Sequence, residues 1–432
     1  MGVDAWRGVV VGGGAVVLAL AVAMQACSGE SSAPAPSAEA VPAPAQAPEP
    51  EGPVPTLVMV QSQFTQTDGG IEPGPAKGML YTQVGGRWRA ETLQDPDSNV
   101  WHKAMAWRGG LLTIGAQKAM LKHWTRDDAG VWSARTLWSP SFGGKFDRLR
   151  DLEIADLDGD GAEEMAIATH DMGVVAVGDE AVDGSWTFQE LDRKPDTFVH
   201  EVEVGDVDGD GKPEFYVTPS ARNKASGESQ PGGVVRYDRQ EDGSYASTTV
   251  VSYEGTHAKE ILVTDLDGDG TDELYAVKEG EVTKQGKSTS LQSPVQIVRL
   301  VPAEGAYQEQ VVATLEGEHQ CRFLVAGDLD GDGVTDLVAS GYKTGLWWIP
   351  GAGKAELPAT PALVSKDSGG FEHATHVADL DGDGQLEIYA ASEKRSFRLL
   401  RRFTWADGGW NVQVIAPIPE RHITWNLQDA AL

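Results

Sequence analysis

The sequence predicts an all-β fold, a seven-bladed β-propeller in which a C-terminal inner strand pairs with the N-terminal blade. Three observations predict it: an acidic nine-residue motif occurs five times, short strand-like runs flank each copy, and the copies recur at a regular interval. The copies begin at residues 156, 206, 265, 328 and 379, so the intervals are 50, 59, 63 and 51 residues. A period of roughly 40–60 residues with four strands per unit is typical of propeller blades.

Each copy of the motif reads Asp-x-Asp-Gly-Asp-Gly-x-x-(Asp/Glu) and gathers four carboxylates. Unpaired carboxylates this close would repel one another strongly, so the pattern indicates a bound cation. Oxygen atoms at positions 1, 3, 5 and 9, with the backbone carbonyl of position 7, suit Ca²⁺, which takes roughly six to eight oxygen ligands. Gly at position 6 of every copy allows the sharp turn of such a loop. We therefore expect about five calcium sites, at Asp156–Glu164, Asp206–Glu214, Asp265–Glu273, Asp328–Asp336 and Asp379–Glu387.

The segments beside the motif are predicted to be strands, not the helices of an EF-hand. An EF-hand needs a bidentate Glu at position 12. This chain has Ile167, Val217, Ala276, Ala339 and Ala390 there. Runs such as Leu-Glu-Ile-Ala before a loop and Met-Ala-Ile-Ala after it are short, apolar or alternating, and bounded by Gly and Asp, which is the strand signal. Each loop therefore joins two adjacent strands.

Two further units lack the acidic loop. Residues 101–137 read as four strands, but their first turn, Arg-Gly-Gly, is too short and too poor in carboxylates to hold calcium. Residues 56–93 supply only three strands, whereas residues 422–429 resemble an inner strand without a blade of its own. If these two segments pair, the ring closes and leaves no sheet edge exposed.

The five motifs resemble the FG-GAP/VCBS repeats of integrin-α-like β-propellers over about residues 148–417. The chain lacks the Phe-Gly…Gly-Ala-Pro signature of the integrin repeat, so it is more similar to the bacterial VCBS branch. The resemblance implies calcium in the turn between the first two strands of a blade. It implies these ligands, with position 7 contributing its backbone carbonyl: Asp156, Asp158, Asp160, Ala162 and Glu164; Asp206, Asp208, Asp210, Lys212 and Glu214; Asp265, Asp267, Asp269, Thr271 and Glu273; Asp328, Asp330, Asp332, Val334 and Asp336; Asp379, Asp381, Asp383, Gln385 and Glu387.

The N-terminal region predicts export and anchoring. Residues 1–26 read as a lipoprotein-type signal peptide, because a short apolar run follows Arg7 and ends at Ala26-Cys27, which resembles a bacterial lipobox. Cys27 would then be acylated. An ordinary secretory peptide with an incidental Cys is the alternative. Residues 27–55, rich in Ala, Pro, Ser and Glu, cannot bury enough apolar surface to fold and would form a tether. Residues 56–432 form the propeller, which we expect at the bacterial cell envelope, facing the outer membrane or periplasm.

The chain is strongly acidic, with a formal net charge of −30. Five bound Ca²⁺ ions would reduce this to about −20, which still argues against a nucleic-acid partner.

A second signal is a basic residue six positions before the first Asp of each motif: Arg150, His200, Lys259, Arg322 and His373. Inner strands surround the propeller axis, so these residues are predicted to ring one mouth of the channel. Such a collar would attract an anion. Alternatively, the residues only balance the nearby acidic side chains and are solvated or locally paired.

The sequence contains no Gly-x-Ser-x-Gly, no phosphate-binding Gly loop, no HExxH and no Cys-rich metal cluster. We therefore expect an envelope-anchored, calcium-stabilised propeller that acts as a binding or interaction module for a protein or glycan, with an anionic or glycan ligand at the basic mouth. The alternative is a calcium-dependent, lyase-like enzyme that acts on an anionic polysaccharide and uses Arg, Lys or His at the rim.

Overall fold

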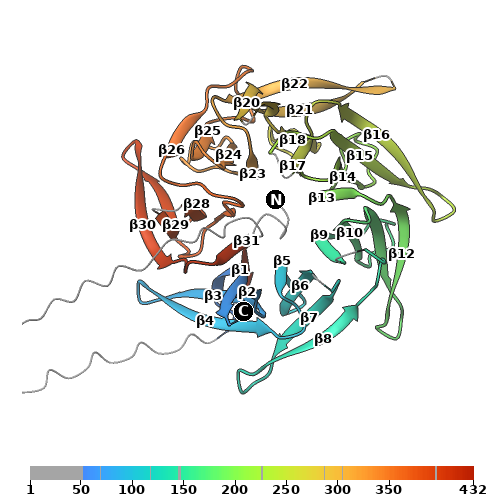
Figure 1. The fold of residues 1–432 in the computed structure, drawn as a ribbon, viewed down its shortest axis with the longest axis vertical. Coiled ribbons are helices and arrows are strands. Elements are labelled where there is room, and N and C mark those ends of the chain that lie inside the picture. The colour runs from blue at the N-terminus through green and yellow to red at the C-terminus, as the bar shows by residue number, and fades with distance from the viewer. Residues whose placement is uncertain are drawn as a thin grey trace, which may run out of the picture.

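Seven antiparallel β-sheets stand like blades around a central axis (Figure 1). The computed structural model describes residues 52–68, 70–116, 118–144, 147–224, 227–286, 288–303, 305–394 and 397–432. These residues contain no α-helix, and so none long and apolar enough to cross a membrane. The predicted signal peptide, the acylation site Cys27 and almost all of the predicted tether lie outside the described residues.

Every blade contains four strands that follow one another from the axis outwards. In the first blade these are β31 (His422–Ala431), β1 (Pro55–Thr67), β3 (Ala76–Val84) and β4 (Arg87–Asp95). The second contains β5 (Val100–Trp107), β6 (Gly110–Ala116), β7 (Leu121–Arg126) and β8 (Trp132–Trp138). The third contains β9 (Arg148–Ala155), β10 (Glu164–His170), β11 (Val174–Glu180) and β12 (Trp186–Arg193). The fourth contains β13 (Thr197–Gly205), β14 (Glu214–Ala221), β15 (Gly232–Arg239) and β16 (Tyr245–Tyr253).

The remaining three blades follow the same order. The fifth contains β17 (Ala258–Thr264), β18 (Glu273–Lys278), β21 (Val295–Ala303) and β22 (Ala306–Leu315). The sixth contains β23 (Cys321–Gly327), β24 (Asp336–Gly341), β25 (Leu346–Ile349) and β26 (Ala362–Ser365). The seventh contains β27 (Thr375–Ala378), β28 (Glu387–Lys394), β29 (Phe397–Ala406) and β30 (Gly409–Pro417).

The hydrophobic core lies between neighbouring blades. The second strand of a blade is covered on both faces, and every residue of β6 and β10 is buried. Leu112 and Ile114 of β6, for example, pack with Leu149 and Leu152 of β9 in the next blade. Outer strands such as β8 are mostly exposed and correspondingly polar. This arrangement explains why the second strands read as continuous apolar runs.

The predicted ring closure is confirmed. Strand β31 pairs antiparallel with β1 from Pro55 opposite Ala431 to Gln63 opposite His422, with one shift of register between Val60 and Gln61. The backbone groups of Val54 and Leu432 extend the pairing with hydrogen bonds of 2.9 and 3.2 Å. The strands β1 and β31, from opposite ends of the described chain, therefore complete one sheet and close the ring.

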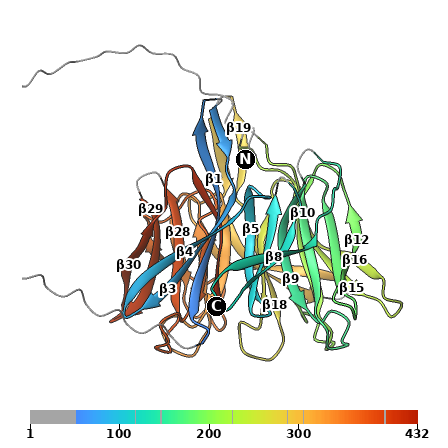
Figure 2. The ribbon, with the colours of Figure 1, turned by 90° about the horizontal axis from the view of Figure 1, so that it is seen from below.

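Two hairpins that the sequence analysis did not predict rise from one face of the ring (Figure 2). The end of β1 pairs with β2 (Gly70–Pro73), and β19 (Glu281–Gln285) pairs with β20 (Ser288–Ser293) as an insertion in the fifth blade. The inner strands begin at this face, because Gln63 near the end of β1 lies opposite His422 at the start of β31. They end at the opposite face, where the acidic loops lie.

Candidate functional site

The five acidic loops each bring carboxylate oxygens together. Every loop has at least three acidic side chains whose oxygen atoms lie within 4.8 Å of one another, a separation that one cation can bridge. The groups are Asp156, Asp158 and Glu164; Asp206, Asp208, Asp210 and Glu214; Asp265, Asp267 and Asp269; Asp328, Asp330 and Asp332; Asp379, Asp381 and Glu387. The remaining predicted carboxylates, Asp160, Glu273, Asp336 and Asp383, belong to the same loops but are outside these closest groups. All-oxygen sets of this kind suit a hard cation such as Ca²⁺.

Backbone amides orient the carboxylates inside each loop. Asp156 accepts hydrogen bonds from the N–H groups of Gly159 (2.7 Å) and Gly161 (3.0 Å), and Glu164 accepts one from Leu157 (2.7 Å). Gly161 has a φ of 88°, and the equivalent glycines of the other four loops range from 81° to 93°. A side chain would be strained in that conformation, which explains Gly at position 6.

The ninth position of the loop carries the most perturbed carboxyl groups. Burial, with smaller contributions from the nearby Asp158 and Asp160, raises the pKa of Glu164 to about 7. Burial likewise raises the pKa of Glu214 to about 7, although Arg236 partly opposes the shift. A divalent cation at the centre of the loop would reverse this effect, because an adjacent positive charge stabilises the ionised carboxylate.

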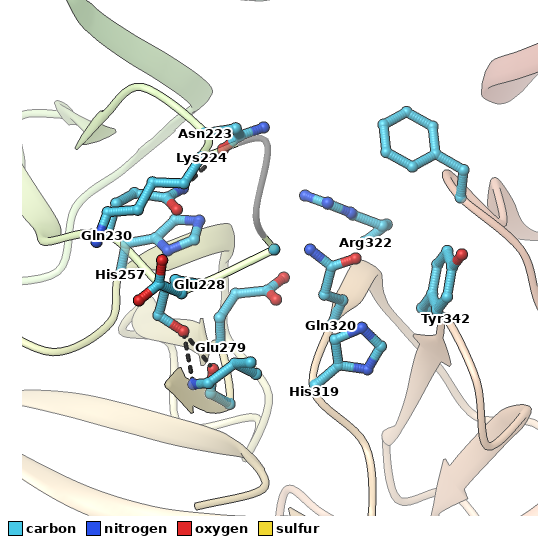
Figure 3. Close-up of a pocket in the computed structure, with 15 residues that line it drawn as sticks. Asn223, Lys224, Glu228, Gln230, His257, Glu279, His319, Gln320, Arg322 and Tyr342 are labelled. Carbon is cyan, nitrogen blue, oxygen red and sulfur yellow. Dashed lines mark hydrogen bonds between the residues drawn. The ribbon is translucent and has the colours of Figure 1, made fainter. Parts of the chain in front are cut away.

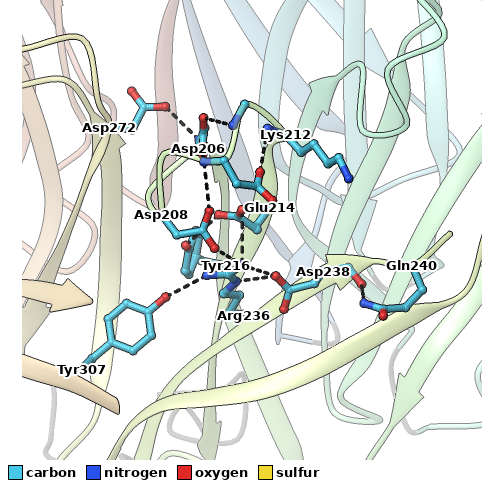
Figure 4. A network of polar contacts seen from close by, with 12 residues as sticks. Asp206, Asp208, Lys212, Glu214, Tyr216, Arg236, Asp238, Gln240, Asp272 and Tyr307 are labelled. Carbon is cyan, nitrogen blue, oxygen red and sulfur yellow. Dashed lines mark hydrogen bonds and ion pairs between the residues drawn. The ribbon is translucent and has the colours of Figure 1, made fainter. Parts of the chain in front are cut away.

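Three loops have an arginine and tyrosine partner that the sequence analysis missed. In the fourth blade Arg236 of β15 lies 2.6 Å from Asp208 and 3.3 Å from Glu214, and the Tyr216 hydroxyl donates to Glu214 at 3.1 Å (Figure 4). Arg299 with Tyr275, and Arg402 with Tyr389, repeat the arrangement in the fifth and seventh blades. The available signal was Tyr two residues after the ninth position of these three motifs.

The predicted basic position coincides with a β-bulge in the inner strands. The register shifts at Arg150 in β9, at His200 in β13, at Lys259 in β17 and at Arg322 in β23. A bulge leaves a residue unpaired and redirects its side chain. The second blade has the same bulge at His102, a residue of a blade without an acidic loop.

These redirected side chains meet near the axis. Lys259 Nζ lies 2.9 Å from His200 Nδ1, and His200 lies 3.1 Å from His170 Nε2. Burial holds the pKa of His102, His170, His200 and Lys259 well below the usual range, and neighbouring cations lower it further. We call these four residues, with Arg150, the basic layer.

Carboxyl groups follow one residue later along the same strands. Arg150 lies 3.5 Å from Glu201 of the next blade and 3.8 Å from Glu372, which precedes the inner strand of the seventh blade. Lys103 lies 2.9 Å from Asp151. Burial raises the pKa of Glu201 well above its usual range and that of Glu260 to about 8. In the interior, the basic layer therefore lies next to a layer of carboxyl groups, which includes Asp151, Glu201, Glu260 and Glu372.

The five residues predicted to ring one mouth of the channel lie in the interior, so the alternative that they are solvated does not hold. All five predicted residues are buried, with exposures between 0 and 6 %. Lys259 instead contacts His200, and Arg150 contacts Glu201 and Glu372 of other blades. His373 does not join the basic layer: its ring bonds the Ser368 hydroxyl (2.6 Å) and the carbonyl of Gly341 (3.0 Å). The sequence pattern identified equivalent positions but could not show that bulges would turn them inwards.

A comparison with protein-family profiles agrees with the repeat pattern predicted from the sequence. A profile described as FG-GAP-like repeat matches residues 156–217 and 328–390. Each match starts at the acidic loop of one blade and ends in the second strand of the next blade, β14 or β28. The chain carries FG-GAP-like repeats. Together with the seven blades, the matches confirm the predicted FG-GAP-repeat β-propeller.

Solved structures share the fold at low sequence identity. A protein from Lactobacillus plantarum is 12% identical, with a TM-score of 0.55, and the match covers 87% of this chain and 99% of that one. Putative 6-phosphogluconolactonases from Bacteroides fragilis and Bacteroides uniformis are 13% and 14% identical, with TM-scores of 0.52 and 0.51; the matches cover 87% of this chain and 98% and 99% of theirs. No curated protein matches the chain. At this identity the likeness concerns the fold alone.

Proposed function

We propose that this FG-GAP-repeat propeller is a calcium-stabilised binding module of the bacterial cell envelope. One observation carries the proposal: five loops of the same geometry each gather carboxylate oxygens within 4.8 Å. The loops join the first and second strands of five of the seven blades, so five bound Ca²⁺ ions would each stabilise the connection between these two strands in one blade. Propellers offer a rigid surface for ligands, and the repeats match a scaffold family that supports binding in general.

Calcium removal tests the proposal. Extracellular-type sites have dissociation constants of about 10⁻⁴–10⁻³ M. At 1 mM Ca²⁺, a site of 10⁻⁴ M adds about 1.4 kcal/mol to the free energy of unfolding. We expect the melting temperature to fall clearly in EDTA and to recover when calcium is restored. Asp269→Ala should lower the calcium-bound melting temperature, whereas Asp128→Ala, at an exposed turn away from the loops, should not. Equal melting with and without EDTA, and no calcium by elemental analysis, would overturn the proposal.

The envelope location is the second part of the proposal, and it rests on the sequence pattern that ends at Cys27. We expect the mature protein to begin at an acylated Cys27 and to partition into detergent. Cys27→Ser should leave the precursor unprocessed or release it. Mass spectrometry of the mature N-terminus decides between this and an ordinary secretory peptide, which predicts an unmodified N-terminus at another residue.

A further inference from the structure

A small pocket lies at the hairpin-bearing side of the ring, between segments of four blades. Figure 3 shows the residues that line it. Its volume is about 110 Å³. Its walls come from segments at the ends of the strands: Gln230 before β15, His257 before β17, Glu279 after β18, Arg322 in the bulge of β23, Tyr342 after β24 and Phe371 before β27. The insertion hairpin closes one side, because Val282 of β19 exchanges hydrogen bonds with Ser229.

Two polar groups in this pocket are buried without a hydrogen-bond partner among the described residues. Arg322 is 4 % exposed and its Nε has no partner; His257 is 5 % exposed and its Nδ1 has none. Leaving such groups unsatisfied costs about 1–3 kcal/mol each, and more for charged groups. The Arg322 guanidinium points into the pocket, with its carbon 5.5 Å from the centre of the Phe371 ring (Figure 3). Arg322 Nε and His257 Nδ1 are therefore available to bind a ligand in the pocket.

The remaining walls restrict the chemistry of that ligand. Glu279 is buried beside Arg322, accepts a hydrogen bond from the Cys321 N–H at 3.2 Å, and has its pKa raised to about 7 by burial. Burial holds the pKa of His257 well below its usual range, so this imidazole is neutral near pH 7. A doubly charged anion such as phosphate would face the Glu279 carboxyl. A singly charged carboxylate carries less negative charge towards Glu279, and its hydroxyl groups can donate hydrogen bonds to that carboxyl group and bond His257.

We propose that this pocket binds a small hydroxylated carboxylate, such as a single sugar acid. The ligand carboxylate pairs with Arg322, its hydroxyl groups bond His257 Nδ1 and Glu279, and its C–H face lies against Phe371 and Tyr342. The pocket volume of about 110 Å³ is smaller than the cavity of about 150 Å³ that accommodates benzene, so the pocket holds only the carboxylate end and the adjacent hydroxyl-bearing carbons of one such ligand, and the rest of the ligand lies in the pocket mouth. The inference rests on the proposed binding function and specifies the ligand class and its site.

Titration calorimetry with the calcium-loaded protein tests the assignment. The probes are D-galacturonate and D-gluconate, with D-glucose, acetate and inorganic phosphate as controls that lack the carboxylate, the hydroxyl groups or the single charge. We expect binding of one or both hydroxy acids and at least tenfold weaker binding of every control. Equal binding of phosphate or D-glucose, or no binding of either hydroxy acid, overturns the assignment.

A pair of arginine variants locates the site. Arg322→Lys keeps the charge but loses the planar fork, so the affinity should fall about tenfold or more. Arg401→Lys is the matched control: Arg401 is also buried, also has an unpartnered Nε, and also lies over a phenylalanine, Phe403, but outside the pocket. It should leave the affinity unchanged. His257→Gln provides a second reading if Arg322→Lys fails to melt cooperatively, and should weaken binding similarly.

The outcomes separate this inference from the proposed function. If calcium raises the melting temperature and a hydroxy acid binds with an affinity that both Arg322→Lys and His257→Gln leave unchanged, the binding module stands and the pocket assignment falls. If calcium has no effect on melting but binding depends on Arg322, the pocket stands and the calcium proposal falls.

Discussion

At the scale of single residues, the unusual feature is the number of ionisable side chains buried near the axis. His373 is an instructive case, because it is fully buried and adopts a φ of 51°. In the neutral ring, Nδ1–H donates to the carbonyl of Gly341 and Nε2 accepts from the Ser368 hydroxyl. Burial lowers the pKa of His373 to about 4.

This pKa predicts a pH dependence of stability. The folded-state pKa lies below the unfolded value of about 6.5, so the contribution of His373 is fully present above that pH and is lost as the pH falls towards 4. Between pH 7 and pH 5 the loss is about 2 kcal/mol. Asn tolerates positive φ and does not titrate, so His373→Asn is the variant of choice.

Urea unfolding of the wild type and His373→Asn at pH 7, 6 and 5, with saturating calcium, checks this prediction. The difference in unfolding free energy between the two proteins should shrink as the pH falls. Parallel pH profiles would mean that His373 stays neutral in the unfolded chain or becomes charged in the folded one, and either contradicts the prediction.

At the scale of the structural element, an arginine on the third strand of the blade lies beside the acidic loop in the fourth, fifth and seventh blades. Arg299 of β21 lies 2.8 Å from Glu273 and 3.8 Å from Asp267. Its charge compensates the buried Glu273 when the loop is empty and opposes a cation when the loop is filled. The loop of the sixth blade has no such arginine among the described residues; there Asp336 accepts from the N–H of Gly351 at 2.6 Å. The five loops should therefore differ in calcium affinity.

Arg299→Met tests this tuning. Without calcium the variant should melt below the wild type, because Glu273 loses its partner. With saturating calcium the deficit should disappear or reverse, since the ion now meets less positive charge. The gap between the melting temperature with saturating calcium and the melting temperature without calcium should therefore be wider in the variant than in the wild type. Arg126→Met, which removes a half-exposed arginine paired with Glu91 and remote from the loops, is the control and should leave the gap at its wild-type value. An unchanged gap in Arg299→Met contradicts the tuning.

At the scale of the whole molecule, ring closure depends on a strand from each end of the chain. Buried side-chain bonds reinforce the backbone pairing: Gln61 donates to Thr424 at 3.0 Å, and Trp425 donates to Ser62 at 2.9 Å. Deleting residues 421–432 removes the innermost strand of the first blade, exposes the edge of β1 and uncovers the neighbouring blades. Exposed edges of this length promote aggregation.

We expect the deletion to abolish cooperative unfolding or to cause aggregation, as measured by circular dichroism melting and size-exclusion chromatography. Deletion of residues 28–50, inside the predicted tether, is the control and should leave the melting temperature unchanged. A 421–432 deletion that remains monomeric and melts like the parent would contradict the closure.

The sequence by itself determined the repeat, the strand order within a blade and the ring closure. The acidic motif is a fixed spacing of Asp and Gly within nine residues, and the strands beside it follow from the local alternation of apolar and polar residues. Both can therefore be recognised in the sequence without knowledge of tertiary contacts. The predicted calcium ligands followed from the same local pattern, and the structure brings three or more carboxylates of every loop together.

Only the tertiary structure decided what the basic residues do. Their regular position, six residues before each motif, could be recognised in the sequence. Whether their side chains face solvent depends on the β-bulges and on how closely the seven inner strands approach the axis. The arginines beside the acidic loops and the pocket around Arg322 could also be recognised only from the tertiary structure. The physical reason is distance along the chain: Arg150 meets Glu372, and His257 and Arg322 line one pocket, because the fold brings together blades that no local spacing relates.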